Sequence, residues 1–124
     1  MAIFKDDLGR EVIIDEMPKR IISVVPSQTE LLYHLHLNAE VVGITKFCVH
    51  PTEWFRSKTR IGGTKNVDIP KIKSLQPHLI IANKEENIQA QIEELANDFL
   101  VWVSDVNNIE EALRMIQAIG DRTD

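Results

Sequence analysis

Cys48 and His50 are the residues of this sequence that come closest to a catalytic pair, a thiol beside an imidazole base. A cysteine nucleophile needs a base within hydrogen-bond reach and a third group that orients this base. The surrounding sequence, in which Pro51 directly follows the histidine, offers no third partner. We therefore expect Cys48 to pack in the fold or to line a ligand site, and thiol catalysis stays a minor alternative.

A metal site is the second chemistry to consider, because His34 and His36 lie close together in the sequence. Residues two apart on a helix point about 200° away from each other, so these histidines cannot bind one ion together. The objection weakens if the helix ends before His36, but surface or capping histidines remain the better interpretation. The single cysteine excludes a multi-cysteine zinc site. We predict no catalytic residue, no metal ligand and no cofactor.

Three further motifs have both a structural and a functional interpretation. Gly62–Asn66 looks like a phosphate loop but lacks the Walker spacing, which favours a turn. Ser27 and Glu30 match a capping box, which satisfies two backbone N–H groups at a helix start, with direct ligand contact as the alternative. Lys84–Asn87 is typical of a charged helix start, although its position after an apolar run also makes it a candidate for ligand binding.

Composition limits the class of protein that must position these residues. The chain has 124 residues, of which 44% are hydrophobic and 27% charged, as in an ordinary soluble domain with one core. The net charge of −5 and the lack of a Lys/Arg stripe argue against nucleic-acid binding. The apolar runs fall far short of the roughly 20 residues of a membrane span, which argues against an integral membrane protein. The first residues do not form a signal peptide, which leaves a cytoplasmic location open.

Four short apolar runs predict buried strands, at Ile21–Val25, Val41–Ile44, Leu79–Ala82 and Phe99–Val103. Helices are expected to begin at Ser27, at Ile69 after an Asp68 cap, after an Asn87 cap and after Asn108. Two β-prone runs between Ile3 and Ile14 predict a hairpin. Thr45–Asn66 is expected to be mostly loop, with a short turn of helix near Glu53–Ser57.

Strands that alternate with helices predict an α/β fold, namely a three-layer, doubly wound parallel sheet of about four strands with an N-terminal β-hairpin. We expect a single α/β lobe over residues 1–124, with the hairpin in residues 1–16 and the parallel unit in residues 19–120. Such sheets bind ligands at the carboxyl ends of their strands. This rule selects four loops, Pro26–Thr29, Thr45–Pro51, Asn83–Asn87 and Ser104–Asn107.

A series of short motifs carries a resemblance to a known family. In chain order they are Asp6–Val12, Pro18–Ser23, Pro26–Glu30, Val42–Ile44, Phe47–Pro51, Ile61–Gly63 and Ile72–Ile80. The series covers nearly the whole chain and resembles the amino-terminal lobe of the periplasmic substrate-binding proteins of ABC importers, the receptors for vitamin B12, iron–siderophores and haem. No single motif is specific, but the ordered set is. The Phe47–Pro51 loop is closer to the cobalamin branch than to the siderophore branch.

The resemblance implies a receptor and not an enzyme. Two α/β lobes joined by a long rigid helix would trap a bulky metal chelate, a corrinoid or a ferric siderophore, between them. Apolar groups would cover the chelate and a few polar groups would orient it, and His50 could reach an axial position on its metal. By position, the cleft residues of this lobe would be Ser27, Gln28, Thr29, Phe47, Cys48, His50, Trp54, Lys65, Asn66, Lys84, Glu85 and Asn87.

The sequence departs from the family pattern at three points. Pro70 stands where relatives often carry a glutamate that meets arginines of the membrane permease, with Asp68 two positions earlier, which puts docking through that salt bridge in question. Leu35-His36 stands where the family often has Leu-Gly at a helix end. The sequence stops at Asp124, where the connecting helix would begin, so the second lobe is absent from it. The family's location implies the periplasm or the cell surface.

Two other classes of function remain as alternatives. A stand-alone α/β interaction or signalling domain would use the same loop face for a protein partner. A homodimer that rebuilds a cleft from two copies would combine both interpretations. Thiol hydrolysis at Cys48 would require a depressed thiol pKa.

Overall fold

The computed structural model describes residues 2–5, 11–14, 19–24, 29, 32, 40–45, 54, 58–63, 65–83, 87 and 89–103. Its strands are β1 (Ala2–Lys5), β2 (Glu11–Ile14), β3 (Ile21–Ser23), β4 (Val41–Ile44), β5 (Thr59–Arg60), β6 (Gly62–Gly63), β7 (Asn66–Val67), β8 (Leu79–Ala82) and β9 (Val101–Val103). Its helices are α3 (Ile69–Leu75) and α4 (Gln89–Ala96). Thr29, Leu32 and Trp54 are also helical. The predicted helix after Asn108 lies outside the described residues.

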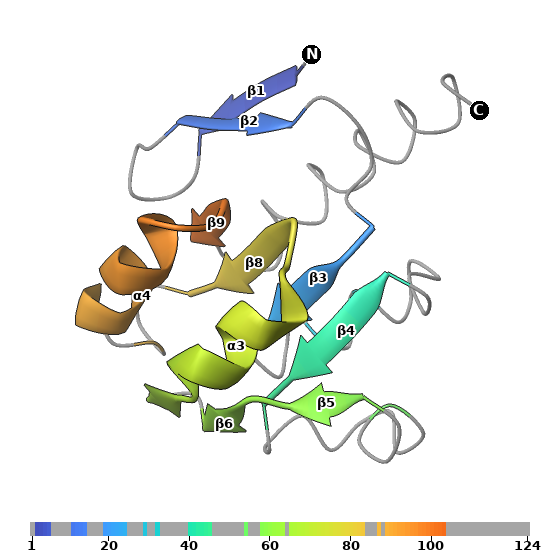
Figure 1. The fold of residues 1–124 in the computed structure, drawn as a ribbon. Helices are drawn as coiled ribbons and strands as arrows, with labels where there is room; N and C mark the ends of the chain where they lie inside the picture. The colour runs from blue at the N-terminus through green and yellow to red at the C-terminus, as the bar shows by residue number, and fades with distance from the viewer. Residues whose placement is uncertain are drawn as a thin grey trace.

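Five parallel strands form the central sheet in the order β5-β4-β3-β8-β9 (Figure 1). This confirms the predicted doubly wound parallel sheet and adds one strand to the predicted number. The added strand, β5, pairs with β4 through Gly43 and Thr59 at the sheet edge. It escaped prediction because two residues, Thr59 and Arg60, are too few and too polar to make an apolar run.

The order of the strands reverses between β3 and β8. From β3 the chain adds β4 and β5 on one side and then β8 and β9 on the other. The neighbours β3 and β8 run in register, with Ile21 beside Leu79 and Ser23 beside Ile81. Ligand crevices in doubly wound sheets open at the carboxyl ends of such a pair, because the two following connections diverge to opposite faces.

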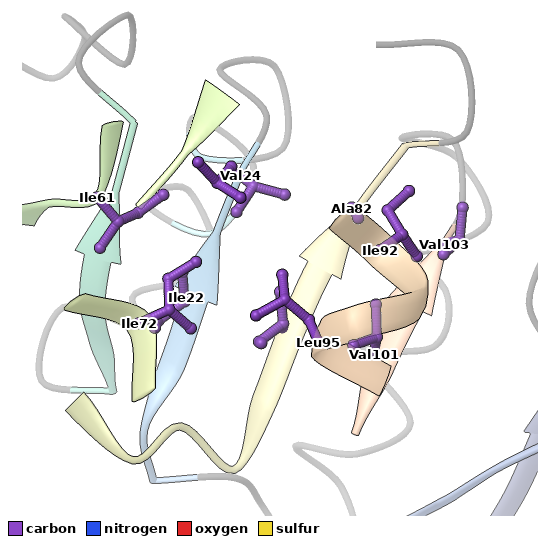
Figure 2. Close-up of a cluster of buried hydrophobic side chains, with 11 residues drawn as sticks. Ile22, Val24, Ile61, Ile72, Ala82, Ile92, Leu95, Val101 and Val103 are labelled. Carbon is purple, nitrogen blue, oxygen red and sulfur yellow. The ribbon is translucent and has the colours of Figure 1, made fainter. Parts of the chain in front are cut away.

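One face of the sheet packs against α3 and α4. Alternate strand residues, such as Ile22 on β3 and Ile80 on β8, form a cluster with Ile72 of α3 and with Ile92 and Leu95 of α4. Figure 2 shows Ile72 over β3 and β4, and the two α4 side chains over β8 and β9. Side chains in such a cluster each contribute roughly 1.5–3 kcal/mol when fully buried.

The opposite face is buried as well. Ile21, Leu79, Ile81 and Trp102 alternate with the residues of the first cluster and are at most 1% exposed. The helical residue Leu32 is fully buried too. Burial on both faces explains why the strands appear in the sequence as continuous apolar runs, and it is typical of a three-layer α/β domain.

Helix α3 has the limits that its capping residues predict. Asp68 Oδ1 accepts a hydrogen bond from the Lys71 N–H at 3.1 Å, and Pro70 lies in the first turn, where its missing N–H costs nothing. At the other end Gln76 adopts the left-handed conformation, with a φ of 48°, and donates to the Lys73 carbonyl. The predicted helix Ile69–Leu75 is therefore confirmed.

Two small antiparallel hairpins complete the described fold. In the first, β1 pairs with β2, as predicted for the segment from Ile3 to Ile14; Figure 1 shows it beside the five-stranded sheet and separate from it. The second, β6 with β7, confirms a turn at Gly62–Asn66. Gly62 has a φ of +95°, and a Cβ there would lie 2.7 Å from the Asn66 carbonyl oxygen, so only glycine fits without strain.

Candidate ligand-binding edge

The buried polar side chains of the described residues gather at one edge of the sheet. They are Ser23, Thr29, Thr45 and Asn87. Ser23 ends β3 and Thr45 follows β4, while Thr29 and Asn87 lie in the connections that leave β3 and β8. All four therefore lie at or just beyond the carboxyl ends of strands, which is the edge where this type of sheet binds ligands.

Ser23 and Thr29 form a buried hydroxyl pair. Thr29 Oγ1 donates to Ser23 Oγ at 2.8 Å, and both residues are fully buried. Ser23 lies between Ile22 and Val24, which face α3 and α4, so its side chain points to the opposite face of the sheet. The bond ties the helical residue that follows β3 to the strand itself. The sequence pattern identified Thr29 as a candidate but missed Ser23, because a serine inside an apolar run shows no sign of function.

Asn87 joins the two strands of the switch point. Its Oδ1 accepts from the Asn83 N–H at 2.8 Å, and its Nδ2 donates to the Val24 carbonyl at 3.2 Å. The Asn87 N–H also donates to the Asn83 carbonyl at 3.0 Å. The sequence predicts Asn87 as a helix cap, but these side-chain bonds connect the residues that follow β3 and β8.

Trp54 lies in the protein interior. It is 1% exposed, so a ligand can reach its ring only if the cover moves. Lys58 Nζ lies 5.2 Å from the centroid of this ring, and the Lys58 N–H donates to the Trp54 carbonyl at 2.8 Å. Burial lowers the pKa of Lys58 below its ordinary value, and the nearby charge of Glu40 partly offsets this effect. Lys58 and Glu40 directly precede β5 and β4, so this group lies at the amino edge of the sheet.

Lys65 and Asn66 are exposed in the β6–β7 hairpin. They line an open groove of about 960 Å³ between the hairpin and helices α3 and α4, to which Asp68, Lys73 and Glu94 also contribute. The hairpin follows the carboxyl end of β5, where the Ile61 N–H donates to the Ile44 carbonyl at 2.9 Å. These two predicted residues therefore lie beside the edge but face a groove over the α3 and α4 side.

Seven predicted ligand residues lie outside the part of the chain that the structure describes. They are Ser27, Gln28, Phe47, Cys48, His50, Lys84 and Glu85. Their role in a site stays a prediction. The same holds for the metal interpretation of His34 and His36.

Among the described residues, no group of three or more His, Cys, Asp or Glu side chains is placed to hold a metal ion. Within the same part of the chain, no helix is long and apolar enough to cross a membrane. The polar groups that gather at the carboxyl edge are neutral hydroxyls and an amide. Such groups orient a ligand through hydrogen bonds.

Comparison with known proteins gives a consistent result. The family described as periplasmic binding protein matches residues 21–124. YvrC of Bacillus subtilis, an uncharacterized ABC transporter substrate-binding lipoprotein, is 32% identical over 121 residues, which are 94% of this chain and 38% of that protein. The vitamin B12-binding protein of Vibrio cholerae (strain O395) is 28% identical over 103 residues, which are 82% of this chain and 37% of that protein.

Solved structures have the same fold. The periplasmic vitamin B12-binding protein BtuF of Vibrio cholerae superimposes with a TM-score of 0.72 and 26% identity, over 86% of this chain and 45% of that one. The iron-uptake substrate-binding protein PiuA of Streptococcus pneumoniae has a TM-score of 0.79 at 16% identity, over 99% of this chain and 45% of that one. This chain thus spans less than half the length of these relatives. The match over the whole parallel sheet shows that the chain belongs to the periplasmic binding protein family.

Proposed function

We propose that this chain is the amino-terminal lobe of the substrate-binding component of an ABC importer for a metal chelate. Its relatives include vitamin B12-binding proteins, and the structural matches include siderophore-binding proteins. The observation that carries the proposal is the gathering of the buried polar groups at the carboxyl edge of a sheet that belongs to this family. The preferred ligand is a corrinoid, and a ferric siderophore is the second choice.

The proposed mechanism is capture without a chemical step. The chelate would lie across the carboxyl edge of this lobe, and a second lobe would cover it from the other side. Apolar and aromatic groups of the loops would cover the rim of the chelate, while hydroxyl and amide groups would fix its orientation. The proposed contacts are the twelve residues predicted above. Of these, Thr29 and Asn87 are buried at the carboxyl edge and would act mainly by holding the other contacts in place, whereas Trp54 is buried beside Lys58 at the amino edge.

We further propose that the protein works outside the inner membrane, as its relatives do, and delivers its ligand to a permease. A partner would meet an unusual surface where α3 begins. Pro70 is exposed there, and Asp68 is already engaged as the helix cap. Docking would therefore use other groups than a glutamate at this position.

The experiment is to determine the intact mass and the compartment of the native protein in its source cell, and then to titrate that protein with cyanocobalamin and with a ferric siderophore. We expect a secreted product about twice the mass of this 14.2 kDa chain that binds one of the probes. The 124-residue chain alone should bind the same probe much more weakly, because half of the cleft is missing. A native product of 14.2 kDa that binds neither probe would refute the proposal and favour an interaction domain.

A further inference from the structure

We propose that Asn87 is a positioning residue, whose amide clamps the carboxyl ends of β3 and β8 together and so sets the geometry of the ligand-binding edge. The inference rests on the proposed function for its link to ligand binding. The clamp itself rests on the three hydrogen bonds that Asn87 makes to Asn83 and Val24.

The chemistry of the side chain fits this role. The clamp needs an acceptor for the Asn83 N–H and, close beside it on the same side chain, a donor for the Val24 carbonyl. An asparagine amide supplies both from adjacent atoms, whereas aspartate supplies two acceptors and leucine supplies neither. The assignment of its oxygen and nitrogen follows from these partners, because the reverse orientation would oppose two donors and two acceptors.

The position of the clamp makes it a determinant of the edge. Val24 and Asn83 are the residues directly after β3 and β8, the pair between which the strand order reverses. The backbone there is already paired, since the Val24 N–H donates to the Ile81 carbonyl at 3.1 Å. Asn87 adds the next link beyond the last sheet bond. Asn87 therefore fixes where the chain leaves each strand. The predicted ligand contacts Lys84 and Glu85 lie in the sequence between Asn83 and Asn87, which are bonded to each other.

The surroundings of the amide strengthen its bonds. Asn87 is 8% exposed and borders a void of about 10 Å³ lined mainly by apolar side chains, among them Val24, Ile80 and Ile92. That volume is at the lower limit for one water molecule. In such a dry environment hydrogen bonds are stronger and the loss of one partner is more costly than at the surface.

Gln91, which lies in the first turn of α4, provides an internal comparison. Its Oε1 accepts from the Val67 N–H at 3.4 Å and so braces the β6–β7 hairpin against α4. This hydrogen bond goes to the hairpin and not to β3 or β8, although Gln91 also lines the void beside Asn87. A variant at Gln91 therefore loosens α4 from the hairpin without breaking the switch-point clamp.

The test compares Asn87→Ala, Asn87→Asp and Gln91→Ala with Gln89→Ala, an exposed residue of α4 whose described bond is to Glu93. Two quantities are measured at a temperature where each variant is folded by circular dichroism. The first is the hydrogen exchange rate of the Asn83 N–H, and the second is the affinity of the native protein, carrying the same substitution, for cyanocobalamin or, if that fails, a ferric siderophore.

We expect Asn87→Ala to raise the exchange rate at Asn83 and to weaken binding, each by about tenfold, as for the loss of one or two buried hydrogen bonds. Asn87→Asp should keep Asn83 protected but place a carboxylate oxygen against the Val24 carbonyl. At pH 7 it should therefore bind as weakly as Asn87→Ala. At about pH 4, where an aspartate carboxyl regains its proton, binding should recover, because the added O–H can donate to Val24. Gln91→Ala and Gln89→Ala should change neither quantity at the edge.

Wild-type affinity in Asn87→Ala or in Asn87→Asp at pH 7 would overturn the positioning role. Unchanged exchange at Asn83 in Asn87→Ala would overturn the clamp itself. The failure of the proposed function gives a different result: if the wild-type chain and the native protein bind neither probe, that function is refuted, while the exchange rate still decides whether Asn87 clamps the two strands.

Discussion

The two edges of the sheet are held together by different kinds of groups. At the amino edge, Arg20 donates from Nε and Nη2 to the Leu75 carbonyl at the end of α3, with the Nε bond at 2.7 Å. The Arg20 carbonyl in turn accepts from the N–H groups of His78 and Leu79. The Lys19 N–H donates to His78 Nδ1 at 3.2 Å. Long, partly exposed side chains and backbone groups make this edge.

At the carboxyl edge the groups are short, neutral and buried. The Thr29 hydroxyl holds Ser23, and the Asn87 amide holds Asn83 and Val24. The difference separates an edge that fastens a helix end from the edge at which we propose ligand binding. Arg20 can fasten a helix end from the solvent boundary, because its charge stays hydrated there. A surface that must present a fixed shape to a ligand is better held by short side chains, which have few rotamers to lose.

The largest expected effect is on the β6–β7 hairpin, which continues the carboxyl edge. Gly62→Ala should lower the free energy of unfolding by about 2–3 kcal/mol, because alanine is strained at positive φ and its Cβ would collide with the Asn66 carbonyl. Urea denaturation measures this change. Gly63→Ala is the matched control, because among the described glycines only Gly62 has a positive φ. Equal losses of stability in the two variants would show that strain at the positive φ of Gly62 is not the cause.

At the amino edge, a substitution of Arg20 should lower the stability nearly as much. Arg20→Ala should lower the free energy of unfolding by about 2 kcal/mol, because it removes two charge-assisted hydrogen bonds from the Leu75 carbonyl. Arg20→Lys should recover only part of this loss, because an ammonium group cannot donate from two fixed positions. Ligand affinity, corrected for the folded fraction, should not change. A change in affinity would contradict the proposal that only the carboxyl edge takes part in ligand binding.

The hydroxyl pair of the carboxyl edge should contribute less to stability and more to binding. Thr29→Val keeps the shape of the side chain but removes the donor to Ser23, and should lower the free energy of unfolding by about 1 kcal/mol. Thr29→Ser retains the hydroxyl and should keep the bond to Ser23 and the affinity for ligand, while it loses about 1 kcal/mol of stability with the buried methyl group. Calorimetric titration of both variants with cyanocobalamin tests whether the pair also orients the edge. A destabilised Thr29→Val variant with unchanged affinity would limit the pair to a packing role.

At the amino edge, one substitution should stabilise the protein. Gln76 ends α3 with a φ of 48°, a conformation that glycine adopts without steric cost. Gln76→Gly should raise the free energy of unfolding by about 0.5–1 kcal/mol. This is a net value, because the greater freedom of glycine in the unfolded chain offsets part of the relieved strain. Thermal unfolding followed by circular dichroism measures it, with the exposed helix residue Ser74→Gly as the opposite control. A loss of stability in Gln76→Gly would mean that its side chain contributes more than its strain costs.

The smallest effect concerns the dependence of stability on pH at the amino edge. Burial lowers the folded-state pKa of Lys58 below 10.5, so the unfolded chain binds this proton more tightly than the folded protein. The free energy of unfolding should therefore gain a small positive slope as the pH rises toward 10.5. Lys58→Met should remove that contribution, whereas the exposed Lys65→Met should leave it. Urea midpoints at pH 8 and pH 10 compare the three proteins, and identical slopes would exclude the effect.

Local sequence determines those elements of this fold that have an uninterrupted pattern or a complete cap. Val41–Ile44 and Leu79–Ala82 are strands with the predicted bounds, because runs buried on both faces leave little choice of ends. Predicted ends drift where another contact competes. The strand expected from Phe99 begins at Val101, because the Phe99 N–H is bonded to Leu95 at the end of α4. The strand expected to reach Val25 ends at Ser23.

The sequence by itself determined the fold class and the helix Ile69–Leu75, because these follow from apolar periodicity and capping chemistry. It also predicts, from strand direction, the edge of the sheet at which we propose a ligand site. Tertiary structure alone decided which side chains share that edge. The bond of Asn87 to Val24 links residues 63 positions apart and depends on the pairing of β3 with β8. The bond of Thr29 to Ser23 depends on how the connection after β3 folds back onto that strand, and the burial of Trp54 beside Lys58 depends on what packs over the ring. A local pattern specifies the type of an element, but the partners of a buried polar group are known only once the chain has packed.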